Sequence, residues 1–166
     1  MSFWTPRIIL HVAGAALLAT AANAQPLPCA SHTLPNRGWR TDSGSVFHIR
    51  LPPGLTRRRV TTIDSEGGRW VGEGSELLYD FGEYSNSLRD SAQTSGTVCE
   101  VTIDSRPARV VIYRDERGRY AFGAHWKGFK EQGFGPVSLT ISGFARDSIA
   151  RDSLLASIWS LTFRRR

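Results

Sequence analysis

Several acidic side chains lie close together between residues 73 and 83, where they could act as an acid–base pair. They are Glu73, Glu76, Asp80 and Glu83, with Tyr79 and Tyr84 among them. Two carboxyl groups can serve as general acid and general base when burial or mutual repulsion separates their pKa values. Glu76 and Asp80 fall on the polar face of an alternating strand, which is also typical of solvated carboxylates. A hydrolase that uses carboxylates near Asp80 is therefore one of two functions that the sequence leaves open.

Histidines offer a second possible chemistry. Strand alternation puts His48 and His125 on the same kind of polar face as Asp80 and Glu100. If these strands were neighbours, two imidazoles and a carboxylate could bind a divalent transition metal. Scattered polar residues on a solvated sheet face explain the same pattern. We therefore predict neither a metal site nor a cofactor.

The motifs of familiar enzyme classes are absent from the sequence. Residues 72–76 read Gly-Glu-Gly-Ser-Glu, which misses the G-x-S-x-G spacing of a nucleophile elbow by one residue. There is also no S-x-x-K, H-E-x-x-H or C-x-x-C motif, and no phosphate-binding glycine loop. These absences favour a binding domain over an enzyme, with no residue assigned a catalytic role.

The N-terminus has the pattern of a secretory signal peptide. Arg7 precedes an apolar run over residues 8–19, and Ala22-Asn23-Ala24 offers small residues for cleavage after Ala24. The run is shorter than the roughly 20 apolar residues of a membrane span. We expect a periplasmic or secreted protein with no transmembrane segment in the mature chain.

The two cysteines are interpreted in the same context. In an oxidising compartment, Cys29 and Cys99 would form a disulfide that ties the N-terminal segment to the sheet. Two separate thiols are the alternative, because Cys99 alternates inward with Val101 and Ile103 and free cysteine is often simply buried.

The chain is basic, with a net charge of +6 that comes largely from arginine. Arginine runs at 57–59 and 164–166 are either anion-binding patches or ordinary solvated charges. Export argues against a nucleic-acid partner. An envelope protein or a small ligand is the expected partner of a protein that is itself monomeric.

Alternating hydrophobicity predicts a series of antiparallel strands and one helix near the end. Tyr79, Phe122 and Leu139 should point into the core. The strand over residues 108–114 is apolar on both faces and should be central. Residues 60–64 and 69–71 should pair across a Gly67-Gly68 turn. The other predicted elements are strands at 47–51, 76–81, 98–103, 120–126, 137–141 and 159–163, and a helix at 148–157 with Asp147 as its N-cap.

The loops carry the remaining candidate residues. Residues 82–96 form a long connection that is either a functional loop, which we favour, or a short irregular helix around 87–92. Phe129 and Phe134 lie among glycines, where they either contact a partner or tuck back into the core, and we favour the second.

These elements predict an α+β fold with a curved, mainly antiparallel sheet of seven to eight strands packed by the C-terminal helix. The domain organisation is a signal peptide at residues 1–24, an extended arm at 25–45 and a single domain at 46–166.

Two segments carry a family resemblance. Phe47-His-Ile-Arg-Leu-Pro-Pro-Gly54 is an early strand, and the segment from Ala150 to Phe163 is a helix running into a strand. This layout resembles the PsbP-like α/β/α sandwich proteins over about a third of the mature chain. The resemblance implies a non-catalytic accessory or binding domain. The chain departs from that pattern because it lacks a first long helix.

The first functional hypothesis is therefore an exported, non-enzymatic binding domain that uses the loops at 64–74, 82–96 and 128–136. The candidate binding residues in and beside these loops are Trp70, Tyr79, Asp80, Glu83, Tyr84, Phe129 and Phe134.

Overall fold

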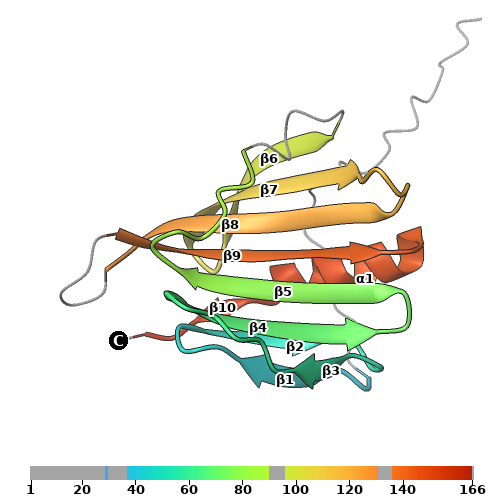
Figure 1. Cartoon of the computed structure of the whole chain (residues 1–166), viewed down its shortest axis with the longest axis horizontal. Coiled ribbons are helices and arrows are strands. Elements are labelled where there is room, and N and C mark those ends of the chain that lie inside the picture. Colours follow the sequence, from blue (N-terminus) through green and yellow to red (C-terminus); the bar gives the residue numbers. More distant parts are fainter. Residues whose placement is uncertain (1–28, 30–36, 90–95, 131–135, 166) are drawn as a thin grey trace, which may run out of the picture.

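The computed structural model describes residues 29, 37–89, 96–130 and 136–165. This part of the chain contains ten strands and one helix (Figure 1). The strands are β1 (Arg40–Ser43), β2 (Phe47–Leu51), β3 (Thr56–Arg58), β4 (Ser65–Gly72), β5 (Ser75–Gly82), β6 (Thr97–Ile103), β7 (Arg106–Arg114), β8 (Tyr120–Lys130), β9 (Pro136–Ala145) and β10 (Thr162–Phe163), and the helix is α1 (Ser148–Trp159).

The strands form two antiparallel sheets. The large sheet has seven strands in the order β3-β4-β5-β9-β8-β7-β6, and the small sheet has the order β1-β2-β10. Helix α1 packs against strands of both sheets and lies behind β9 and β5 in Figure 1. The predicted mainly antiparallel α+β fold is confirmed. Its finer description as an α/β/α sandwich stays a prediction.

Alternation along the strands determines which side chains enter the core. Tyr79, Phe122 and Leu139 are 3%, 2% and 0% exposed and belong to one hydrophobic cluster, as predicted. We refer to this face of the large sheet as the inner face and to the opposite face as the outer face. The small sheet adds Phe47 and Ile49 of β2, which are completely buried. The core therefore lies between the large sheet on one side and α1 with the small sheet on the other.

The helix forms where the sequence predicts it. Asp147 is the N-cap, and its carboxylate accepts a hydrogen bond from the backbone N–H of Ala150 at 2.8 Å. Leu154, Leu155 and Ile158 turn toward the core and are almost fully buried. The helix continues to Trp159, so the predicted strand at 159–163 is reduced to the two residues of β10.

The predicted turn at Gly67-Gly68 is wrong. Strand β4 runs straight through both glycines and pairs with β5 along its whole length, while β3 lies earlier than expected and residues 60–64 are not a strand. A Cβ atom at Gly68 would overlap the ring of Tyr79. Gly68 therefore makes room for a core aromatic ring instead of turning the chain.

Strand β7 is not central, because β9 holds that position and β7 lies next to the edge strand β6. It is apolar on both faces for a different reason. Val110 enters the main core, while Val111 on the outer face is fully buried beside Gly123, over which the Leu88 side chain lies. Residues 83–89 are outside any helix or strand, as the loop hypothesis predicted, and residues 90–96 of that prediction lie largely outside the described residues.

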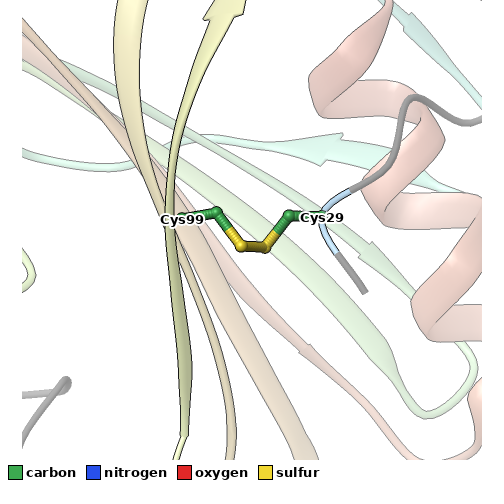
Figure 2. Close-up of a disulfide and its surroundings, with 2 residues drawn as sticks. All are labelled: Cys29 and Cys99. Carbon is green, nitrogen blue, oxygen red and sulfur yellow. A yellow bond between two sulfur atoms is a disulfide. The ribbon is translucent and has the colours of Figure 1, made fainter. Parts of the chain in front are cut away.

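Cys29 and Cys99 form the predicted disulfide, with a sequence separation of 70. The bond leaves the edge strand β6 on the side where α1 lies (Figure 2). Cys29 is 8% exposed and belongs to the core cluster, so the bridge closes the core at this edge of the large sheet. Among the described residues, no helix has the length and apolar content required to cross a membrane.

Candidate functional site

A row of polar residues crosses the outer face of the large sheet. Cross-strand neighbours share a face, so the row follows directly from the antiparallel register. It reads, from β5 to β6, Asp80, Thr140, His125, Arg109 and Glu100, and Gly67 of β4 lies beside Asp80 at its end. Of the residues whose polar face the sequence predicted, this row brings Asp80, His125 and Glu100 onto one face.

A cavity of about 300 Å³ lies at one end of this row, between the 60–64 segment and the loop after β5. We call it the Asp80 cavity. Its lining is Val60, Thr62, Ile63, Ser65, Gly67, Gly68, Leu78, Tyr79, Asp80, Asn86, Thr140 and Ser142. The volume is at the lower end of the range of about 300–1,000 Å³ that small-molecule sites occupy.

Asp80 has a buried carboxylate oxygen that no neighbour satisfies. Its Oδ1 atom is inaccessible to solvent and has no hydrogen-bond partner in the described part of the chain. A buried polar atom without a partner costs free energy, roughly 1–3 kcal/mol and more for a charged group. Asp80 as a whole is only partly buried and lines the cavity, so a change of its side-chain torsion would let the carboxylate accept a hydrogen bond from a ligand there.

Thr140 is the centre of a buried hydrogen-bond network behind the cavity. Its hydroxyl donates to the carbonyl oxygen of Asn86 at 2.6 Å, and the Ser85 hydroxyl lies 2.7 Å away. The His125 Nδ1 atom lies 2.8 Å from the same hydroxyl. Because the single Thr140 proton is given to Asn86, His125 must carry its proton on Nδ1 and donate it to Thr140. The network holds the loop after β5 against the sheet.

His125 is kept neutral by its surroundings. Its side chain is 4% exposed, and burial is the largest cause that lowers its pKa. The positive charges of Lys127, Arg109 and Arg89 lower the pKa further, against a smaller opposing effect from the Asn86 carbonyl. His125 is thus a neutral part of the network.

The structure does not bring His48 and His125 together, as the metal site considered from the sequence would require. His48 lies on β2 of the small sheet, where its Nδ1 atom is 2.7 Å from the Ser43 hydroxyl, whereas His125 lies on the large sheet. No group of three or more His, Cys, Asp or Glu side chains in the described residues is arranged to hold a metal ion.

The carboxylates near Asp80 are also dispersed. Glu76 was expected on a solvated face, but it is 7% exposed and forms an ion pair with Arg69 at 2.5 Å. It lies four strand residues from Asp80, a separation of roughly 13 Å, which exceeds the distance at which glycosidase carboxylates cooperate. Glu73 pairs instead with Arg146 at 3.0 Å. Glu76 and Glu73 are therefore engaged elsewhere.

Trp70 and Tyr79 lie on the inner face, away from the cavity's carboxylate. The Trp70 indole is fully buried and donates from Nε1 to Asp42 at 2.7 Å. The Tyr79 hydroxyl donates to Glu66 at 2.9 Å and accepts from Arg57 at 3.2 Å. Burial, followed by the neighbouring Glu66 carboxylate, raises the pKa of Tyr79 to about 12. Trp70 joins the two sheets through Asp42, and Tyr79 does so through an edge-on ring contact with Phe47 of β2 at 5.1 Å.

The remaining candidate binding residues lie near the ends of β5 and β8. Glu83 and Tyr84 are exposed in the turn that follows β5, and the Tyr84 side chain is 80% exposed. Phe129 tucks back into the core, as predicted, where it packs edge-on against Phe81 at 5.5 Å. Phe134 lies outside the described residues.

Sequence reasoning missed the cavity residues on other strands. Thr140 and Ser142 alternate with the buried Leu139 and Ile141 in β9, so their outward direction was predictable. Their place beside Asp80 depends on the pairing of β9 with β5, which no local pattern specifies.

Comparisons with known proteins give little more. No protein-family model and no curated protein matches the sequence. Among solved structures, this chain is similar to a protein from Bacteroides thetaiotaomicron VPI-5482 determined at 1.50 Å resolution, with 14% sequence identity and a TM-score of 0.42. The match covers 72% of this chain and 45% of that one. At this level of similarity, the comparison establishes neither a shared fold nor a shared function.

Proposed function

We propose that the protein is an exported, non-enzymatic binding domain that holds a small ligand with a hydrogen-bond donor in the Asp80 cavity. The single observation that carries this proposal is the Asp80 carboxylate, which lines the cavity and whose Oδ1 atom lacks a hydrogen-bond partner in the described residues. A cationic donor such as an ammonium or guanidinium group suits a carboxylate best, because hydrogen bonds between charged groups are about twice as strong as neutral ones.

The walls of the cavity fit a small polar molecule. Thr62, Ser65 and Asn86 supply further polar groups at its rim, while Val60 and Leu78 supply apolar surface. A few fixed polar groups within an apolar lining are the usual composition of a ligand site. The loop at residues 83–89 is held in place by the Ser85–Thr140 hydrogen bond, so this wall of the cavity is preformed.

The disulfide supports the proposed export of the protein. A disulfide between Cys29 and Cys99 is stable in an oxidising compartment and rare in the cytosol. It agrees with the signal-peptide pattern of residues 1–24, whose cleavage after Ala24 would be seen as a mature N-terminus at Gln25 by mass spectrometry. The PsbP-like resemblance, which also implies a binding role, stays a prediction.

The binding proposal is tested by titrating the isotope-labelled protein with methylguanidinium and methylammonium chloride while backbone amide shifts are recorded. We expect saturable shifts at Asp80, Asn86 and Thr140, and none with sodium chloride at matched ionic strength. Asp80→Asn removes the charge and should abolish the shifts.

Asp64→Asn is the matched control for this titration. Asp64 is an exposed carboxylate just before β4 and does not line the cavity, so its loss should leave the shifts unchanged. Equal responses from the two variants, or no saturable response to either cation, would contradict binding at Asp80.

A further inference from the structure

A second and larger cleft opens on the other side of β5, between the two sheets. Its volume is about 1,010 Å³, and it lies where the β6–β7 turn, the end of β8 and the C-terminal end of β10 come together (Figure 1). Asp80 and Phe81 are adjacent in β5 and point to opposite faces, so Phe81 lines this cleft while Asp80 lines the other cavity. We call it the Arg106 cleft.

The inner surface of the Arg106 cleft is aromatic. Phe129 and Phe163 are in contact, with ring centroids 5.4 Å apart, and Phe129 also packs edge-on against Phe81. Phe81 and Phe129 are 5% and 8% exposed, so most of their surface is already packed. The exposed remainder gives the cleft an apolar wall at a place where solvent can enter.

The rim of the same cleft is strongly positive. Arg106, Arg164 and Arg165 line it, and Asp104 is the one acidic residue among the described residues of its lining. The Asp104 carboxylate already accepts a hydrogen bond from the backbone N–H of Phe163 at 2.5 Å. None of the three arginines forms an ion pair within the described residues, although six other arginines do.

Arg106 is held in position by the aromatic wall itself. Its guanidinium carbon lies 4.6 Å from the centroid of the Phe129 ring and 5.0 Å from that of Phe163. Contact with ring faces stabilises a cation without using its N–H groups. The turn that carries Arg106 is also defined, because Asp104 and Ser105 have positive φ angles of 46° and 64°, as in a type I′ hairpin turn. A positioned guanidinium whose N–H groups have no partner among the described residues is well suited to bind a carboxylate or phosphate through two hydrogen bonds.

We propose that the Arg106 cleft binds an anionic amphiphile, a small molecule with a carboxylate or phosphate head and an apolar tail. The head pairs with Arg106, aided by the charges of Arg164 and Arg165, and the tail lies against Phe129 and Phe163. The backbone of Arg164 is anchored by a 2.9 Å hydrogen bond to Val46, which places these charges at the rim. This site is separate from the Asp80 cavity and does not depend on the function proposed for it.

The test uses decanoate as the probe and isothermal titration calorimetry as the measurement. Decanol has the same tail without the charge, and acetate and inorganic phosphate have the charge without the tail. We expect decanoate to bind, decanol to bind at least about tenfold more weakly, and acetate and phosphate to give no measurable heat. Decanoate binding should also weaken at high salt, because a charged rim is screened.

Variants separate the cleft from general surface charge. Arg106→Gln should weaken decanoate binding about tenfold or more, the scale of a charge-assisted hydrogen bond. Arg119→Gln is the matched control, because Arg119 also stacks on a ring, that of Phe144 at 3.7 Å, but is paired with Asp115 and lies outside the cleft. It should bind decanoate like the unmodified protein.

Arg165→Gln keeps the test decisive if Arg106→Gln does not fold, because no described contact depends on the Arg165 side chain. It should weaken binding several-fold while the unfolding midpoint stays the same. The proposal is overturned if decanol binds as tightly as decanoate, if Arg165→Gln and Arg119→Gln behave alike, or if the protein binds anionic phospholipid vesicles but not monomeric decanoate.

Discussion

The indole Nε1 atom of Trp70 donates a hydrogen bond to the carboxylate of Asp42 at 2.7 Å and thereby joins the two sheets. Trp70 lies on β4 of the large sheet and Asp42 on β1 of the small sheet. The Asp42 side chain is only 14% exposed and also pairs with Arg57 at 2.8 Å. A buried charge with several partners strongly penalises the loss of any one of them.

Replacing Asp42 by asparagine should lower the free energy of unfolding by about 2 kcal/mol, because hydrogen bonds to a charged group are lost. Trp70→Phe removes the Nε1 donor and keeps most of the ring. Urea denaturation of both single variants and the double variant measures the coupling between the two residues. We expect a coupling of about 1 kcal/mol or more, whereas strictly additive effects would mean that the hydrogen bond contributes nothing.

Acid should weaken the same contact. Burial acts to raise the pKa of Asp42, but the hydrogen bonds from Trp70 and Ser43 and the charges of Arg57 and Arg40 outweigh it and lower the pKa below 3.8. The unfolded chain therefore takes up the proton first as pH falls. The stabilisation is complete above about pH 3.8 and is lost as pH drops through the folded-state pKa. Between pH 5 and pH 2, the free energy of unfolding should therefore fall less for Asp42→Asn than for the unmodified protein, as measured by urea denaturation at each pH.

The lowered pKa of His125 predicts a second effect of pH on stability, nearer to neutral pH. Burial and the neighbouring positive charges lower the pKa of His125 below 6.5, so the unfolded state again binds the proton more readily. The stability that depends on neutral His125 should be fully present above about pH 6.5. Below that pH the free energy of unfolding should fall by at most about 1.4 kcal/mol per pH unit, the limit for one proton. His125→Gln should remove this slope. His48→Gln, a change on the small sheet, should retain it, and an unchanged slope in His125→Gln would assign the effect to another group.

Loss of the disulfide should destabilise the protein substantially. The bridge closes a loop of about 70 residues, for which the chain-entropy model gives roughly 4 kcal/mol. Cys29→Ser with Cys99→Ser should lower the urea midpoint accordingly, and a reducing agent should shift the unmodified protein but not the double variant. If the reducing agent shifts both proteins equally, it does not act through this bond.

A side chain at position 143, in the central strand β9, should destabilise the protein for steric reasons. A Cβ atom there would overlap the carbonyl oxygen of Glu76 on the neighbouring strand, and a backbone atom in the middle of a sheet cannot move aside. Gly143→Ala should cost about 3 kcal/mol of stability. Gly54→Ala is the contrast, since Gly54 has a φ of +87° and nothing near its missing Cβ, so roughly 1 kcal/mol of backbone strain is expected. Similar thermal unfolding midpoints for the two variants would contradict this difference.

The sequence predicted those features that local geometry decides. Side chains alternate along a strand whatever it pairs with, so the inward direction of Tyr79, Phe122 and Leu139 could be deduced from spacing alone. The cap at Asp147 is equally local, since it satisfies N–H groups only a few residues away. The disulfide is not local, but it could be predicted because the sequence contains only two cysteines.

Tertiary structure alone decided what lies beside what. Glu76 is polar and sits on the outer face, yet Arg69 on the adjacent strand buries and pairs with it, which alternation cannot reveal. Asp80 meets Thr140 only because β5 and β9 pair, and β9 comes nearly sixty residues later in the chain. No local sequence pattern indicates that β5 pairs with β9, because this pairing depends on how the whole inner face packs. The chain by itself therefore determined which side chains face inward, whereas both cavities and their charges were decided by strand order.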